Sequence, residues 1–152
     1  MSPTLAWMHA KPHIIDWQIG TDVIDHYGHV NNVAYVAQIE KVAWSHSNAL
    51  GLTIEQYQDI DRGMAIKHHE IDYLLPCHTG QTLACATWII DCDQRLMLTR
   101  QFQFICRERQ KTVFTAKTQF VCIALSSGIP KRMPDIFKRI YGGAQIAVSA
   151  QE

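Results

Sequence analysis

The chain has 152 residues, and its 14 basic and 14 acidic side chains give a formal net charge of zero. A neutral chain of this length is typical of one domain, and its charge gives no reason to expect nucleic acid or an anionic membrane as a partner. No apolar run approaches the roughly 18 residues that a membrane helix requires. The composition therefore predicts one globular domain that buries its own core.

The cysteines indicate a reducing environment. There are five, an odd number, and no two form a C-x-x-C pair. Four of them fall within strand-like segments, where a cysteine behaves as a small apolar residue. The short apolar patch at residues 5–8 has no basic residue before it, so no signal peptide is expected. We expect a cytoplasmic protein.

The two ends of the chain lack a regular pattern. Residues 1–12 carry two prolines and no periodicity, and we expect a flexible N-terminal arm. Alternating residues at 13–19 predict the first strand. Residues 142–152 begin with two glycines and are expected to form a disordered tail. The domain itself is therefore expected to span residues 13–141.

A long helical pattern follows the first strand. It begins at Asn31 or Asn32, either of which is a good N-cap, and ends just before Gly51. On a helical wheel the polar residues form one narrow stripe, which consists of Gln38, Lys41, Ser45 and Asn48. Such a helix is expected to be surrounded by protein on nearly all sides. Glu40 falls roughly opposite the stripe, so we expect an interior carboxylate that is partnered or perturbed.

The rest of the chain reads mainly as strands. A short helix is predicted at residues 53–61, and strands at 64–75, 82–91, 95–107 and 112–125 are separated by turn signals. Strand 95–107 alternates apolar and polar residues, which predicts one buried and one solvated face. Residues 135–141 fit one or two helical turns. This order predicts an α+β protein in which a curved, five-stranded antiparallel sheet wraps around one long central helix.

One short block joins candidate chemistry to the start of that helix. Asp25 and His29 precede Asn31 and Asn32, and Tyr35 lies one turn further on. A carboxylate just ahead of a helix has free backbone N–H groups beside it, together with the positive end of the helix dipole. Taken alone, Asp25 also fits a turn, the two asparagines fit helix caps, and Tyr35 fits the core.

This block, Asp25-x-x-x-His29-Val30-Asn31-Asn32-x-x-Tyr35, resembles that of the hotdog-fold thioesterases of the 4-hydroxybenzoyl-CoA thioesterase and acyl-CoA thioesterase group. It is also similar to the block of plant-type acyl-ACP thioesterases. Residues 72–76 with Gly80 extend the resemblance, and residues 128–134 do so more weakly, so it covers most of residues 13–134. The acyl-ACP type usually has Asn two places after the Asp, where this chain has Tyr27. That departure favours the acyl-CoA branch.

The resemblance implies a hotdog fold and hydrolysis of acyl-CoA thioesters to free acid and CoA, without a metal or an organic cofactor. Asp25 is the first candidate for the acid, either as a general base for water or as a nucleophile. Glu40 is the competing carboxylate, with a structural hydrogen bond as the alternative for it. His29 is expected either to bond the thioester carbonyl or to orient Asp25. The rival functions are an acyl-ACP thioesterase and a non-catalytic protein that binds acyl thioesters.

The remaining candidates concern substrate and partners. The helix-start residues are expected to form the oxyanion hole and contact substrate; they are Val30, Asn31, Asn32 and Tyr35. Lys131 and Arg132 are weaker candidates for the CoA phosphates. Adjacent His68 and His69 would point to opposite faces of a strand, so no metal site is expected. The resemblance also implies a homodimer, or a tetramer of such dimers, with sites at the interface.

Overall fold

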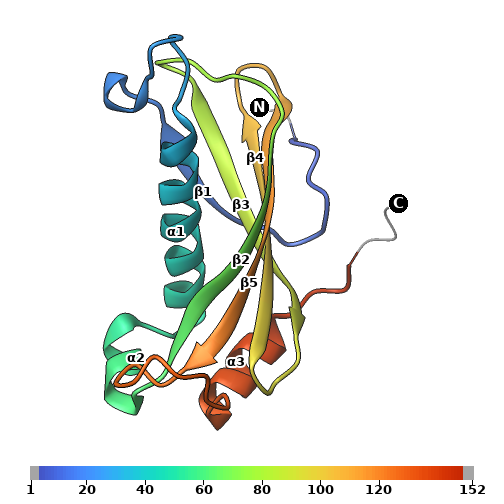
Figure 1. Cartoon of the computed structure of the whole chain (residues 1–152). Coiled ribbons are helices and arrows are strands. Elements are labelled where there is room, and N and C mark those ends of the chain that lie inside the picture. The colour runs from blue at the N-terminus through green and yellow to red at the C-terminus, as the bar shows by residue number, and fades with distance from the viewer. Residues whose placement is uncertain (1–3, 149–152) are drawn as a thin grey trace.

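The computed structural model describes residues 4–148, so the predictions for residues 1–3 and 149–152 lie outside the described residues. Figure 1 shows a long helix lying against a curved sheet, with two shorter helices at one end. The helices are α1 (Asn32–Ala49), α2 (Ile54–Ile60) and α3 (Asp135–Ala144). The strands are β1 (His13–Gln18), β2 (Gly63–Tyr73), β3 (Thr82–Cys92), β4 (Met97–Cys106) and β5 (Lys111–Ile123), and a short 3-10 helix, η1 (Thr21–Val23), follows β1. Every predicted helix and strand is present.

The five strands form one antiparallel sheet in the order β1-β3-β4-β5-β2. Consecutive strands β3, β4 and β5 form a meander, because short turns can join only antiparallel neighbours. β1 and β2, which flank α1 in the sequence, occupy the two edges. The predicted hotdog architecture, a five-stranded sheet curved around one helix, is confirmed.

α1 packs on the sheet through one face only. Its buried residues are Tyr35, Gln38, Ile39, Val42 and Ser47. The opposite face is open in the single chain, where Val33 is 77% exposed and Glu40 is also exposed. The expectation of a helix surrounded on nearly all sides is therefore wrong for one chain. The wheel correctly showed few polar residues, but it assigned Gln38 to the solvent side, and that side chain lies against Cys85 of β3.

β4 is buried on both faces, so the predicted half-buried strand is also wrong. Its second face is covered by the N-terminal segment, which runs along the side of the sheet away from α1 (Figure 1). The amide of Met8 donates to Oε1 of Gln103, and His9 bonds Gln101. These contacts bury two glutamines that the sequence pattern assigns to solvent. The flexibility of residues 1–12 stays a prediction, but part of this segment makes defined contacts.

The C-terminal segment also differs from the predicted tail. α3 continues to Ala144, and the Ile146 amide then donates to the Ile89 carbonyl. Gln145 accepts from the Cys92 amide through its side chain. Residues 142–146 are therefore attached to β3, because the backbone edge near Ile89 offers hydrogen-bonding groups that this segment satisfies.

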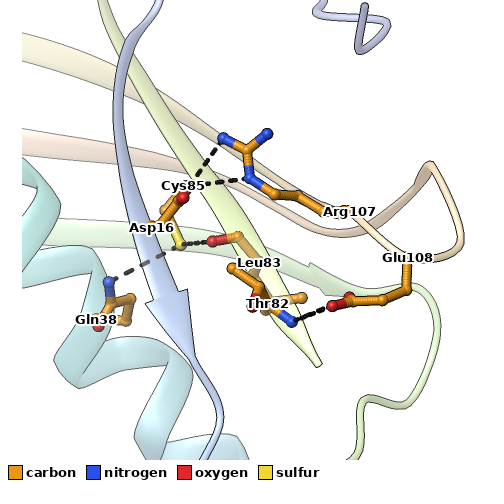
Figure 2. A network of polar contacts seen from close by, with 7 residues as sticks. All are labelled: Asp16, Gln38, Thr82, Leu83, Cys85, Arg107 and Glu108. Carbon is orange, nitrogen blue, oxygen red and sulfur yellow. Dashed lines mark hydrogen bonds and ion pairs between the residues drawn. The ribbon is translucent and has the colours of Figure 1, made fainter. Parts of the chain in front are cut away.

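A polar network joins β1 to the β4–β5 turn, as Figure 2 shows. Arg107 forms an ion pair with Asp16 at 2.8 Å, and the Thr82 amide donates to the Glu108 carboxylate at 3.0 Å. Both partners of the ion pair are substantially exposed, so it contributes little net stability.

Candidate active site

The loop before α1 is a tight turn organised by Asp25. The Asp25 amide donates to the His29 carbonyl at 2.8 Å, and Gly28 adopts a left-handed φ of 78°. Oδ1 of Asp25 accepts from the amides of Tyr27 at 2.9 Å and His29 at 3.2 Å. Within residues 4–148, Oδ2 has no hydrogen-bond partner. The carboxylate therefore serves the turn with one oxygen and retains the other for a second contact.

Asn31 is the N-cap of α1. Its Oδ1 accepts from the Ala34 amide at 2.8 Å, and its Nδ2 donates to the Val23 carbonyl at 3.0 Å. One side chain thus fixes both the first helical turn and the preceding 3-10 segment. The cap interpretation of Asn31 is confirmed.

Two of the amides expected in an oxyanion hole are already engaged. The Val30 amide donates to the Cys77 carbonyl at 3.0 Å, and the Asn31 amide donates to the Val23 carbonyl at 2.8 Å. The first residues inside the helix, Asn32 and Val33, have amides without an acceptor among the described residues. Such free N–H groups are inherent to a helix start. The available donors are therefore displaced by one or two residues from Val30 and Asn31.

One cavity of about 310 Å³ lies at the N-terminal end of α1. Asp25, His29 and Asn32 line it together with the apolar segment that follows β2. Val30 and Tyr35 also reach its wall. The structure thus brings together most of the residues that the sequence block singled out, with Asp25 and Asn32, the first residue of α1, at one opening.

The His29 ring does not orient Asp25 through a side-chain hydrogen bond. It packs edge-to-face against His78, with ring centroids 5.0 Å apart, while only its backbone amide meets the Asp25 carboxylate. Of the two expected roles, the geometry favours contact with a ligand in the cavity.

Tyr35 is mainly a core residue. It is 4% exposed and stacks on Phe114 at 4.9 Å. Burial raises the pKa of its hydroxyl, which contacts the Cys77 thiol. Tyr35 therefore supports the wall of the cavity as a neutral side chain.

Glu40 is not an interior carboxylate. It is exposed on the open face of α1, roughly 12 Å along the helix axis from Asn32 at the usual rise per residue. Its side chain faces β2. Burial of His69 on that strand lowers the pKa of the ring, and the negative charge of Glu40 partly offsets this effect. Within one chain it lies apart from the Asp25 cavity.

Lys131 and Arg132 also lie apart from that cavity. Both are exposed in the loop between β5 and α3, at the α2 end of the molecule (Figure 1). Arg62 donates through Nε to the Arg132 carbonyl at 3.3 Å, which ties this loop to the end of α2. α1 has 18 residues and spans roughly 27 Å, so the pair lies far from the Asp25 cavity of the same chain.

The histidines do not gather into a metal site within the described residues, where no group of three or more potential ligands is present. His69 instead bonds the Thr118 hydroxyl through Nδ1 at 2.8 Å. Adjacent His68 is exposed on the edge strand.

Sequence reasoning missed Arg100 of β4. The guanidinium is 2% exposed and donates to Nδ1 of His46 at 2.7 Å and to the Ser47 hydroxyl at 2.8 Å. It also lies over the Phe120 and Tyr141 rings. Position 100 lies on the same face of β4 as Leu98, Phe102 and Phe104, which are all buried. A charged residue in this apolar alternation is the sequence signal that could have identified Arg100 as buried.

A second cavity, of about 200 Å³, lies above Arg100 between α1 and β2. Its walls are largely apolar, with Ile39 and Trp44 from α1 and Met64 from β2. Arg100 and the Ser47 hydroxyl lie on the polar part of its lining, and Glu40 lies on its open side. The molecule thus has an open cavity at one end of α1 and a narrower one at the middle of the helix.

Comparison with known proteins identifies the family. The model of the Thioesterase-like superfamily matches residues 19–140, whereas none of the curated proteins matches significantly. Among solved structures, a 1,4-dihydroxy-2-naphthoyl-CoA thioesterase from Synechocystis has a TM-score of 0.77 at 18% identity, over 87% of this chain and 96% of its own. A hypothetical protein from Staphylococcus aureus in complex with CoA has a TM-score of 0.82 at 16% identity, over 97% and 94%.

A third similar structure is the 12:0-ACP thioesterase from Umbellularia californica, with a TM-score of 0.80 at 14% identity, over 93% of this chain and 53% of its own. At these identities the structural matches show a shared fold. No helix within residues 4–148 has both the length and the apolarity needed to span a bilayer. Because the family model covers most of the sequence, the chain belongs to the Thioesterase-like superfamily.

Proposed function

We propose that this protein hydrolyses acyl-CoA thioesters to the free acid and CoA. The observation that carries the proposal is the cavity that Asp25 shares with Asn32, the first residue of α1. Membership of the superfamily supports thioester chemistry, and a similar structure that contains CoA supports the choice of carrier.

The chemistry requires few groups. Oδ2 of Asp25 either acts on water as a general base or attacks the thioester carbonyl directly. Direct attack breaks the C–S bond, releases the CoA thiolate and gives a mixed anhydride, which water then hydrolyses to the free acid and the Asp25 carboxylate. The amides of Asn32 and Val33 stabilise the oxyanion, aided by the helix dipole. The leaving thiol has a pKa of about 8.5 if it resembles a cysteine, so no strong general acid is needed. His29 contacts the substrate from the cavity wall.

We propose a homodimer as the working form. β2 is an 11-residue edge strand, and the adjacent open face of α1 exposes Val33. An unpaired edge beside an exposed apolar helix face is suited to a second copy. In an antiparallel pair the α2 end of one copy lies beside the Asp25 loop of the other. That arrangement would allow Lys131 and Arg132 to meet the phosphates of CoA.

The five cysteines are all unpaired and buried. Free thiols persist in reducing compartments, which supports a cytoplasmic location.

The function is tested by thiol release from a panel of acyl-CoAs. Wild type is expected to release CoA, and Asp25→Asn to be slower by about 10²- to 10⁴-fold, the usual contribution of a general base. The amide retains an oxygen for the Tyr27 and His29 amides, so the turn is preserved. Asp22→Asn, an exposed neighbour in η1, is the matched control.

Other outcomes identify the rivals. Equal rates for wild type and Asp25→Asn, with full loss in folded Glu40→Gln, would transfer the acid role to the helix. Turnover of acyl-ACP but not acyl-CoA would favour a carrier-protein thioesterase. Binding of acyl-CoA without any turnover would indicate a non-catalytic protein.

The dimer is tested by light scattering on the eluted protein. Val33→Asp is expected to convert a dimer into a monomer, since it places a charge on the exposed face, and an acid in the first helical turn is favourable for the helix itself. Val148→Asp changes a comparably exposed valine on another part of the surface and should leave the mass unchanged. A monomeric wild type would contradict the proposed assembly.

A further inference from the structure

We propose that the cavity above Arg100 selects acyl groups whose far end carries a carboxylate, so that the preferred substrates are CoA monothioesters of dicarboxylic acids. The inference rests on the proposed thioesterase function and specifies its substrate class. It is carried by a buried cation on the lining of an otherwise largely apolar cavity.

Arg100 has no carboxylate partner in the described part of the chain. The one ion pair among residues 4–148 joins Arg107 to Asp16. Glu40 lines the same cavity, but its exposed carboxylate is not within ion-pair distance of Arg100. The guanidinium remains charged, because an arginine does not lose its proton in proteins under ordinary conditions.

The neighbours of Arg100 solvate the cation without neutralising it. Ser47 and Tyr141 supply hydroxyls, and the Tyr57 hydroxyl bonds that of Tyr141. His46 accepts from Arg100, and burial followed by the charge of Arg100 lowers the pKa of His46 to about 3. His13, stacked on His46, also has a lowered pKa from burial and Arg100. The cluster therefore retains one uncompensated positive charge.

An uncompensated buried charge is costly, and an apolar residue of similar volume would often be at least as stable. The donors of Arg100 suggest what offsets that cost during function. A guanidinium has five N–H groups; the bonds to His46 and Ser47 use two of them, and a contact with the Tyr141 hydroxyl engages a third. Its planar fork matches a carboxylate, and such charge-assisted bonds are stronger in a site shielded from water.

The position of the cavity suits the far end of an acyl group. It borders Ile39 and Glu40, whereas the Asp25 cavity borders Asn32 and Tyr35, earlier on the same helix. An acyl chain with its carbonyl at the α1 N-terminus can run along this side of the helix, between α1 and the second copy of the proposed dimer. Apolar walls formed by Trp44 and Met64 would enclose its methylene groups.

The experiment compares matched acyl-CoA pairs that differ only at the far end. Hexanoyl-, octanoyl- and decanoyl-CoA are paired with their ω-carboxy counterparts, and benzoyl-CoA with 4-carboxybenzoyl-CoA. Wild type is expected to show a kcat/KM at least 10-fold higher for the carboxylated member of at least one pair. Equal values, or preference for the methyl-ended member in every pair, would overturn the inference while leaving thioesterase activity established.

Variants assign the preference to Arg100. Arg100→Met keeps the length of the side chain and should reduce the preference by about 10- to 100-fold, as expected for the loss of a hydrogen bond to a charged group. Arg100→Lys should retain part of it, and Arg107→Met, which removes an exposed cation, should retain all of it. A preference that persists in folded Arg100→Met would overturn the assignment. Circular dichroism establishes folding for each variant.

Binding measurements test the Arg100 cavity even if the protein shows no turnover. If wild type hydrolyses none of these thioesters, the proposed function fails, and binding of the same pairs by calorimetry tests the cavity alone. Tighter binding of the carboxylated member, abolished in Arg100→Met, would support the inference without catalysis. Equal binding of both members would contradict it.

Discussion

The Asp25 cavity and the Arg100 cavity are built in opposite ways. The Asp25 cavity takes its carboxylate, its imidazole and its helix-start residue from eight consecutive positions, 25–32, which are mostly at or near the surface. The Arg100 cluster combines β4, α1, α2 and α3, and the hydrogen-bonded Ser47 and Tyr141 are 94 positions apart. The first is a local motif that presents a carboxylate and free amides to solvent. The second is a tertiary assembly that holds a charge away from solvent.

This difference predicts that the Asp25 region determines the rate and that Arg100 determines the choice of substrate. Changes in the Asp25 region should alter the rate for every substrate alike, since that region acts on the common thioester. Changes at Arg100 should alter discrimination between substrates. A single variant that changed both the overall rate and the ratio of kcat/KM between substrates would contradict this distinction.

After Asp25→Asn, the largest effect is expected at the oxyanion donors. Asn32→Pro removes one amide at the first helical position, where proline is well tolerated, and Asn31 before it already has an extended conformation at φ −72° and ψ 154°. We expect kcat to fall by about 10²- to 10³-fold, the loss usual for one oxyanion donor. The fall should be equal for both members of each acyl-CoA pair.

Asn32→Ala is the matched control, because it removes the side chain and keeps the amide. Its rate should remain close to that of wild type. If proline and alanine at position 32 give the same kcat, the amide of residue 32 is not an oxyanion donor.

The next effect concerns stability at the Arg100 end. His46 has a folded pKa of about 3 and an ordinary value of 6.5. Between these values the unfolded chain holds more protons on this ring, so the free energy of unfolding falls as the pH falls below 6.5. Between pH 6.5 and pH 5 the loss is at most about 2 kcal/mol, and less to the extent that solvent screens the ring.

Urea denaturation at the two pH values measures this loss. His46→Asn retains an acceptor for Arg100 but does not titrate, so its free energy of unfolding should change less between pH 6.5 and pH 5. The pKa of His13 is also lowered, so His13 adds a pH dependence of the same sign to the wild type and to the variant. Identical pH dependence in wild type and variant would show that the His46 ring is not held neutral by the fold.

The contrast between the regions also explains what the sequence could predict. Strand alternation and helix caps are local signals, so the three α-helices and five strands of residues 4–148 were located, as was the Asp25 to Tyr35 block. Glu40 was misplaced because a helical wheel shows which residues share a face but not which face meets the sheet. Arg100 was missed because its partners, His46 and Ser47, are more than 50 positions away. The only sequence signal that indicated burial of Arg100 was its position in the apolar alternation of β4.

The smallest effect is expected for changes at Asn31. They test whether the Asp25 region acts independently of the Arg100 end of α1. Asn31→Ala removes the cap to Ala34 and the bond to Val23, and should lower the free energy of unfolding by about 1 to 2 kcal/mol. Asn31→Asp keeps the cap, gains from the helix dipole and loses only the Nδ2 donor, so its loss should be smaller. Thermal melts rank wild type above Asp and Asp above Ala. Because Asn31 anchors the first turn that presents the Asn32 amide, kcat should follow the same order with both acyl-CoA members equally affected. A change in their ratio would instead reveal coupling between the two ends of α1.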